Sequence, residues 1–112
     1  KIKSEHLDPS LSVFPPLLTL AEVAALAGRS ALWIGNSNGL SHVAVAGGAA
    51  TVQIHGPTAS APWTPPDKSR HRAVQRTEGC VRCEKNVCAK GTHECMTQLN
   101  VESVLNAALK LL

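Results

Sequence analysis

Residues 31–56 read ALWIGNSNGLSHVAVAGGAATVQIHG, and the fold prediction rests mainly on these residues. It begins with a short apolar run, Ala31–Ile34, which is typical of a buried strand and stops at a glycine. A helix is expected over Leu40–Ala46, closed by two glycines, and a β-branched strand over Thr51–His55. Short strands joined by a helix are typical of a parallel βαβ unit, so the sequence predicts an α/β fold.

Helices are expected on both sides of this unit. The preceding stretch, FPPLLTLAEVAALAGRS, carries Thr19 as a candidate N-cap and Glu22 three residues later, which is the capping-box spacing. Gly28 is the expected stop of that helix. Near the end of the chain, Asn100 is a candidate N-cap for an amphipathic helix that begins at Val101.

The segment between the second strand and the last helix is expected to be mostly irregular. Residues 59–72 hold three of the seven prolines and read as a surface loop. A short strand is expected over Ala73–Gln75, and a cysteine-rich loop over residues 76–99. The three residues Arg70–Arg72 form a short basic run, for which a solvated face is the default interpretation and an anionic membrane surface the alternative.

Length and charge limit the classes of protein to consider. The 112 residues suffice for one small domain, and 44% hydrophobic residues argue against disorder. A net charge of +3 with 3% aromatic residues does not make a nucleic-acid-binding surface. No apolar run approaches the length of a membrane span, and the polar start is unlike a secretory signal. Because the chain starts without Met, we expect it to be a piece of a longer protein.

The carboxyl ends of the two central strands are the candidate ligand site. A right-handed crossover places Gly35–Gly39 and Gly56–Thr58 on one edge of the sheet, where open α/β sheets bind ligands. The helix that starts there offers free N–H groups and a positive dipole end to an anion. A plain turn capped by Asn or Ser explains the same pattern. The candidate binding residues are Ser37, Asn38, Gly39, Leu40, Ser41, His42, Gly56, Pro57 and Thr58.

Four cysteines lie close together near the end of the chain. Cys80, Cys83, Cys88 and Cys95 have the spacing C-x2-C-x4-C-x6-C, and His93 is a spare nitrogen ligand. Four thiolates can complete a tetrahedral structural site for zinc or iron. Two disulfides and four free thiols are the alternatives, and the spacing leaves all three open. No base partner for a cysteine nucleophile is evident.

Two stretches carry a resemblance to a known family. IGNSNGLSHVAVAGGAATVQIHGPT and CVRCEKNVCAKGTHECMTQLNVESVLNAALKLL resemble the C-terminal domain of the ADP-heptose:lipopolysaccharide heptosyltransferases, glycosyltransferase family nine. The resemblance runs from about Leu20 to the end of the chain. The residues that match the family pattern in the first stretch are Gly39, His42, Ala44, Ala46, Gly56, Pro57 and Thr58.

The resemblance implies a fold and an activity. It implies a GT-B enzyme in which residues 1–112 form part of the doubly wound, Rossmann-like C-terminal domain, with helices on both faces of a parallel sheet. The donor would be an ADP-heptose-like nucleotide sugar, and the acceptor the lipopolysaccharide core, bound by an N-terminal domain outside these residues. Transfer would proceed with inversion and without a catalytic cofactor. The implied location is the cytoplasm, at the inner face of the inner membrane.

The chain also departs from the family pattern, and these departures keep other functions open. The family has an aspartate where this chain has Ser37, and we expect the N-terminal domain with its general base to lie outside these 112 residues. We therefore expect the 112 residues alone to be inactive, and we leave open whether they belong to an enzyme. The alternatives are a small metal-stabilised binding module and a non-catalytic relative.

Two aromatic side chains near the candidate site have two interpretations each. His55 follows the second predicted strand, where a satisfied structural histidine is favoured over a ligand contact. Trp63 lies among prolines, where anchoring the loop on the sheet is favoured over stacking on a base or sugar.

Overall fold

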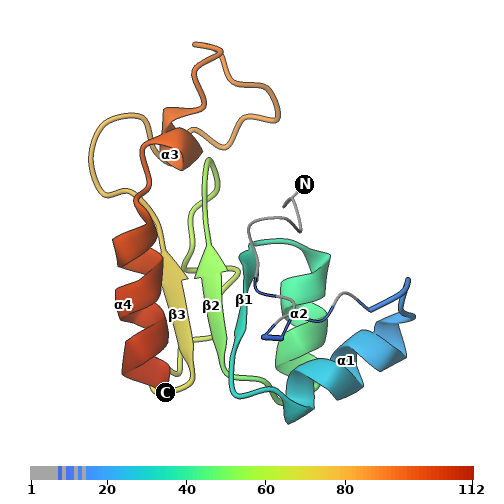
Figure 1. Ribbon diagram of the computed structural model, residues 1–112. Helices are drawn as coiled ribbons and strands as arrows, with labels where there is room; N and C mark the ends of the chain where they lie inside the picture. The colour runs from blue at the N-terminus through green and yellow to red at the C-terminus, as the bar shows by residue number, and fades with distance from the viewer. Residues whose placement is uncertain (1–7, 9, 12, 14) are drawn as a thin grey trace.

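The computed structural model describes residues 8, 10, 11, 13 and 15–112. Four helices and three strands follow one another along this part of the chain (Figure 1). They are α1 (Leu20–Arg29), β1 (Trp33–Asn36), α2 (Gly39–Ala46), β2 (Thr51–Ile54), β3 (His71–Val74), α3 (Glu94–Thr97) and α4 (Val101–Leu111).

The strands form one parallel sheet in the order β1-β2-β3. This arrangement confirms the predicted parallel βαβ unit. The register places Trp33 beside Thr51 and Thr51 beside His71. β1 begins two residues later than predicted, because the hydrogen bonds of this strand start at the Trp33 N–H, which donates to the carbonyl of Ala50 just before β2.

β3 begins earlier than the predicted strand over residues 73–75. His71 belongs to it and is buried, so the solvated basic face expected there is wrong at this residue. The Thr51 hydroxyl lies 2.9 Å from Nδ1 of His71, and the Thr51 N–H donates to the carbonyl of Arg70. Through these contacts with β2, His71 of the basic run becomes part of the sheet.

Helices cover both faces of the sheet (Figure 1). On one face, Trp33 packs against a cluster formed by Ala27 of α1 with Ala44 and Ala49 of the α2 region. On the opposite face, α4 packs its Ala108 against β2 and β3. This architecture is compatible with part of a Rossmann-like domain.

The two N-terminal helices approach each other closely at glycines. The capping box at Thr19 and Glu22 is present, as predicted. Gly28 is not the stop, however, because α1 continues through it to Arg29. A Cβ at Gly28 would overlap the carbonyl oxygen of Gly47, so this glycine serves the contact between α1 and α2.

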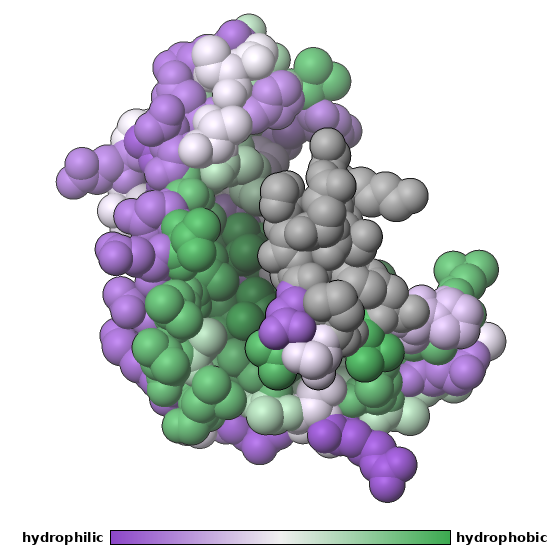
Figure 2. Space-filling model, viewed as in Figure 1, coloured by the Kyte–Doolittle hydropathy of each residue, from purple (hydrophilic) through white to green (hydrophobic). Residues whose placement is uncertain are grey.

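α4 buries one side and exposes an apolar stripe on another. The Asn100 side chain accepts from the Ser103 N–H, which confirms the predicted N-cap. Figure 2 shows apolar surface over this helix, where the exposed side chains are those of Val101, Leu105, Leu109 and Leu112. Within the described residues, every helix is too short or too polar to pass through a lipid bilayer.

Candidate functional site

A cavity of about 320 Å³ opens where the carboxyl ends of β1 and β2 lie side by side. The loop after β1 and the first turn of α2 supply four of its lining residues, and the segment after β2 supplies two. The parallel order of the strands is what brings these two segments together. The lining residues are Ser37, Asn38, Gly39, His42, Thr58 and Trp63, five of which the sequence named as candidates.

The start of α2 is capped by a side chain. Asn38 Oδ1 accepts hydrogen bonds from the N–H groups of Leu40, at 3.0 Å, and Ser41, at 3.4 Å. The structural interpretation of this asparagine as an N-cap is thus correct. A Cβ added at Gly39 would meet no atom within 4 Å, so the backbone there is open to the cavity.

Two candidate residues of this loop point elsewhere. Ser41 is fully buried, and its hydroxyl donates to the carbonyl of Asn36 at 2.6 Å. The Leu40 side chain lines a different, apolar cavity together with Val23 and Trp33. Neither side chain lines the cavity at the carboxyl ends of the strands.

Only Thr58 of the Gly56–Thr58 group lines this cavity. Pro57 lines the neighbouring cavity with the cysteines, and the Gly56 backbone lies under the side chains of Met96 and Cys95. The carbonyls of Gly56 and Thr58 both accept from Nε2 of Gln75, at 3.0 and 2.6 Å. Gln75, at the end of β3, therefore fixes this loop, a role that no local sequence pattern indicated.

Trp63 and His42 face the cavity together. Their ring centroids are 6.1 Å apart, with the planes inclined at 56°. Trp63 is 52% exposed, so about half of its surface is open to solvent, and its anchoring of the proline loop stays a prediction. The exposed indole leaves the stacking interpretation available.

His55 lies behind this cavity and has a structural role. It is fully buried, and its Nε2 lies 2.9 Å from the hydroxyl of Thr64. Burial lowers the pKa of its imidazole, which favours the neutral ring at neutral pH. Through Thr64, His55 positions the turn over residues 60–64 that carries Trp63.

The four cysteines line a separate cavity. Backbone hydrogen bonding, chiefly from the N–H of His93, lowers the pKa of the Cys88 thiol. Across the described part of the chain, no three Cys, His, Asp or Glu side chains stand where they could hold one metal ion. The metal, disulfide and free-thiol alternatives therefore remain predictions for this segment.

Comparison with known proteins gives one result. Residues 3–93 match glycosyltransferase family 9 (heptosyltransferase), a range that includes both loops of the cavity and three of the four cysteines. The match starts earlier than the expected resemblance and ends before α4. Comparisons with curated proteins and with solved structures gave no match. The family match covers most of the chain, and the protein therefore belongs to glycosyltransferase family 9, the heptosyltransferase family.

Proposed function

We propose that the cavity between α2 and Thr58 binds the diphosphate of an ADP-heptose-like nucleotide sugar. The observation that carries this proposal is the meeting of the Ser37–His42 loop and Thr58 in one cavity, in a chain of a glycosyltransferase family. Ligands of open α/β sheets bind at this edge. The cavity is also of a size that suits part of a nucleotide.

The start of α2 supplies the groups for the diphosphate. The open backbone at Gly39 allows a phosphate to come close, and the positive end of the helix dipole favours its charge. The hydroxyls of Ser37 and Thr58 donate hydrogen bonds from two sides. His42, in the first turn of the helix, donates an imidazole N–H to a phosphate oxygen.

The Asn38 cap determines which backbone groups take part. Its side chain already occupies the N–H groups of Leu40 and Ser41. The diphosphate therefore depends on Gly39 and on side chains more than on the helix N–H groups. These donors stabilise the charge that develops on the departing diphosphate during transfer.

Trp63 supplies a flat apolar surface at the edge of the same cavity. Aromatic rings stack on bases and on the apolar faces of sugars. The exposed indole beside His42 is suited to the base or the ribose of the donor.

The rest of the reaction follows from the same proposal. Heptose is transferred with inversion to the lipopolysaccharide core, which an N-terminal domain binds together with the general base. The transfer reaction in this cavity needs no catalytic cofactor. The enzyme acts in the cytoplasm at the inner membrane, which it contacts peripherally.

Nucleotide titration tests the donor site. Amide NMR spectra of the protein are recorded with increasing concentrations of ADP. Separate titrations with UDP and GDP are the controls for the identity of the base. We expect ADP to shift amides of residues 37–42 and Thr58 selectively. His42→Ala should weaken the ADP shifts, while Asn106→Ala, an exposed change on α4, should leave them unchanged. A folded sample in which none of the three nucleotides moves these amides contradicts the proposal.

The second candidate is a non-catalytic relative, because Ser37 lines the cavity where the family carries an aspartate. A serine hydroxyl binds sugar hydroxyls but brings no negative charge. On this alternative Ser37→Asp strengthens nucleotide-sugar binding relative to the unaltered protein. Unchanged binding of an ADP-sugar in an NMR titration of the same kind counts against it.

A further inference from the structure

Residues 75–100 form a long segment with little support from the hydrophobic core, since Leu99 is the one hydrophobic side chain of the segment that packs against a core cluster. Not one residue in this range is buried, and its only regular element is the short helix α3. In Figure 1 the segment rises as a lobe beyond the carboxyl ends of the strands. Long irregular segments are uncommon in compact domains unless something other than apolar burial fixes them.

The four thiols of this lobe share one cavity. Cys80, Cys83, Cys88 and Cys95 all line a space of about 250 Å³. Lys85 and His93 line the same space. All four cysteines, drawn from a stretch of sixteen residues, therefore face the same cavity.

Three residues of the lobe have a strained backbone conformation, which other interactions must stabilise. Among the described residues, the non-glycine positions with positive φ are Arg82, Glu84 and His93, and all three lie in this segment. Each such conformation costs on the order of 1 kcal/mol or more and persists where the surroundings impose it. Arg82 and Glu84 flank Cys83, and His93 lies two residues before Cys95. The strain is therefore located at the cysteines.

We propose that Cys80, Cys83, Cys88 and Cys95 bind one Zn²⁺ ion as thiolates and that this metal centre holds the lobe in place. Four thiolates in tetrahedral geometry, at about 2.3 Å from the metal, make a closed structural site. The resulting complex carries two negative charges, and Lys85 in the same cavity offsets one of them. Because the thiols do not yet stand at ligand distance, binding draws the lobe closed and is coupled to its folding.

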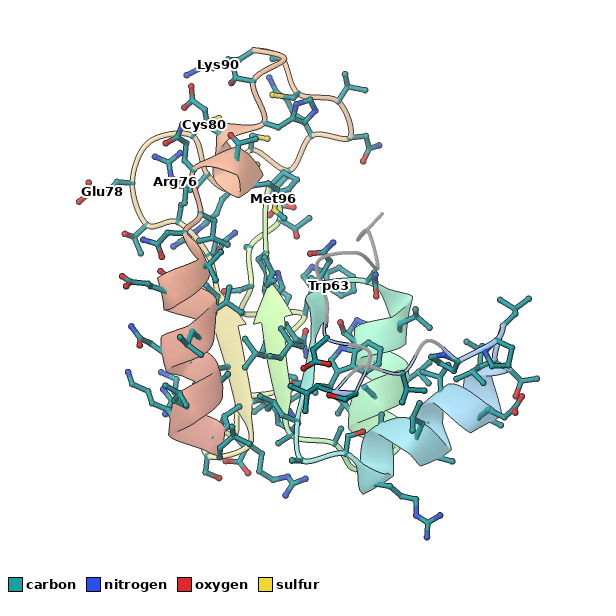
Figure 3. All side chains as sticks on the ribbon, viewed as in Figure 1. Trp63, Arg76, Glu78, Cys80, Lys90 and Met96 are labelled. Atoms are coloured by element: carbon teal, nitrogen blue, oxygen red, sulfur yellow. The ribbon has the colours of Figure 1, made fainter. Side chains whose placement is uncertain are left out.

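The lobe is attached to the loop that follows β2. The Glu84 N–H donates to the carbonyl of Pro57 at 2.9 Å, and the Ala59 N–H donates to Oε1 of Glu84 at 2.7 Å. Figure 3 places Met96 over the end of β2, in agreement with its contact at Gly56. A metal at Cys83 would therefore fix Glu84, and Glu84 would fix the loop that carries Thr58. The metal site itself does not depend on the proposed donor site.

Metal analysis of the purified full chain tests the proposal. The protein is isolated under reducing conditions, and zinc and iron are counted per chain by mass spectrometry. We expect about one zinc per chain, as for a four-thiolate site. Cys83→Ser and Cys88→Ser should each lose most of this metal. Asn86→Ser, which changes another residue of the same cavity, should retain it.

Replacement of the metal by Co²⁺ identifies the ligands. Four-thiolate cobalt shows intense sulfur-to-metal charge-transfer absorption, which a metal bound elsewhere on the surface lacks. Removal of the metal by a chelator should speed amide hydrogen exchange in residues 75–100 and at Ala59, and leave β1 and β3 unchanged. This pattern separates a local metal site from general unfolding.

Three results would overturn the assignment. Metal-free protein with four titratable thiols shows that the cysteines are free. A mass lower by four hydrogens shows two disulfides instead. Stoichiometric iron in place of zinc, with a red four-thiolate spectrum, overturns the choice of metal. Protein that contains zinc but binds no nucleotide would contradict the proposed donor site and leave the zinc site standing. The two proposals can therefore be tested independently.

Discussion

Gly28 and Gly47 set how closely α1 and α2 approach. The carbonyl oxygen of each helix region faces the glycine of the other, and a Cβ at either position would overlap backbone atoms. Backbone cannot move aside as a flexible side chain can. The sequence showed Gly28 only as a helix stop, because a contact with a residue nineteen positions away leaves no local signal.

Gly28→Ala should therefore destabilise the protein. Alanine favours a helix over glycine by about 1 kcal/mol, so helix propensity alone would predict a gain. The overlap with Gly47 reverses the sign, and we expect the free energy of unfolding to fall by about 1–3 kcal/mol in urea titration. The matched control is Ala25→Gly, an exposed change on the same helix that should cost about 1 kcal/mol. A higher urea midpoint for Gly28→Ala would contradict the close contact.

The buried histidines make stability depend on pH. Burial lowers the pKa of His55, and burial together with the Arg70 charge lowers that of His71. The unfolded chain therefore binds protons more readily, with an ordinary pKa near 6.5. Stability is at its full value above that pH and falls as the pH drops below it.

The urea midpoint should accordingly decrease between about pH 7.5 and 5.5. We expect the two buried histidines, whose pKa values burial lowers, to carry this change. Asn106→Ala, an exposed change on α4, should keep the slope of this decrease. His71→Gln should flatten it, and an unaltered slope in that variant would exclude His71 as a source.

At the scale of elements, the first turn of α2 combines a structural and a binding role in one loop. The sequence predicted this loop because a strand, a polar bend and a helix follow one another within 14 residues, Trp33–Ala46. It could not separate Gly39 and His42, which face the cavity, from Leu40 and Ser41, which do not. That separation depends on how the helix is rotated against α1 and β1, and many weak contacts determine it together.

Two substitutions at Asn38 separate these roles. Asn38→Ala removes the cap and should lower the free energy of unfolding by about 1 kcal/mol. Asn38→Asp keeps the acceptor and should leave stability nearly unchanged or raise it slightly. The new carboxylate would stand beside the proposed diphosphate, however, so calorimetric titration should show weaker ADP binding. Equal ADP affinity in Asn38→Asp and the unaltered protein would place the diphosphate elsewhere.

At the scale of the whole molecule, the candidate site depends on contacts between distant parts of the chain. The parallel sheet follows from the sequence, since two short apolar strands with a helix between them have few other arrangements. The contact between the loop after β2 and the end of β3 does not follow from it. Gln75 reaches back across the sheet edge to Gly56 and Thr58, and only the folded chain reveals these partners.

Gln75→Leu tests whether this long-range contact shapes the cavity. The side chain keeps its volume but loses the donor, which leaves the carbonyls of Gly56 and Thr58 without their partner. We expect the free energy of unfolding to fall by about 1–3 kcal/mol and amide exchange to rise in residues 56–59. ADP binding should weaken because Thr58 is no longer held at the cavity. Gln98→Leu, an exposed amide near the same end of the molecule, serves as the control. If Gln75→Leu loses stability but binds ADP unchanged, then Thr58 is not part of the donor site and the contacts must come from the α2 loop alone.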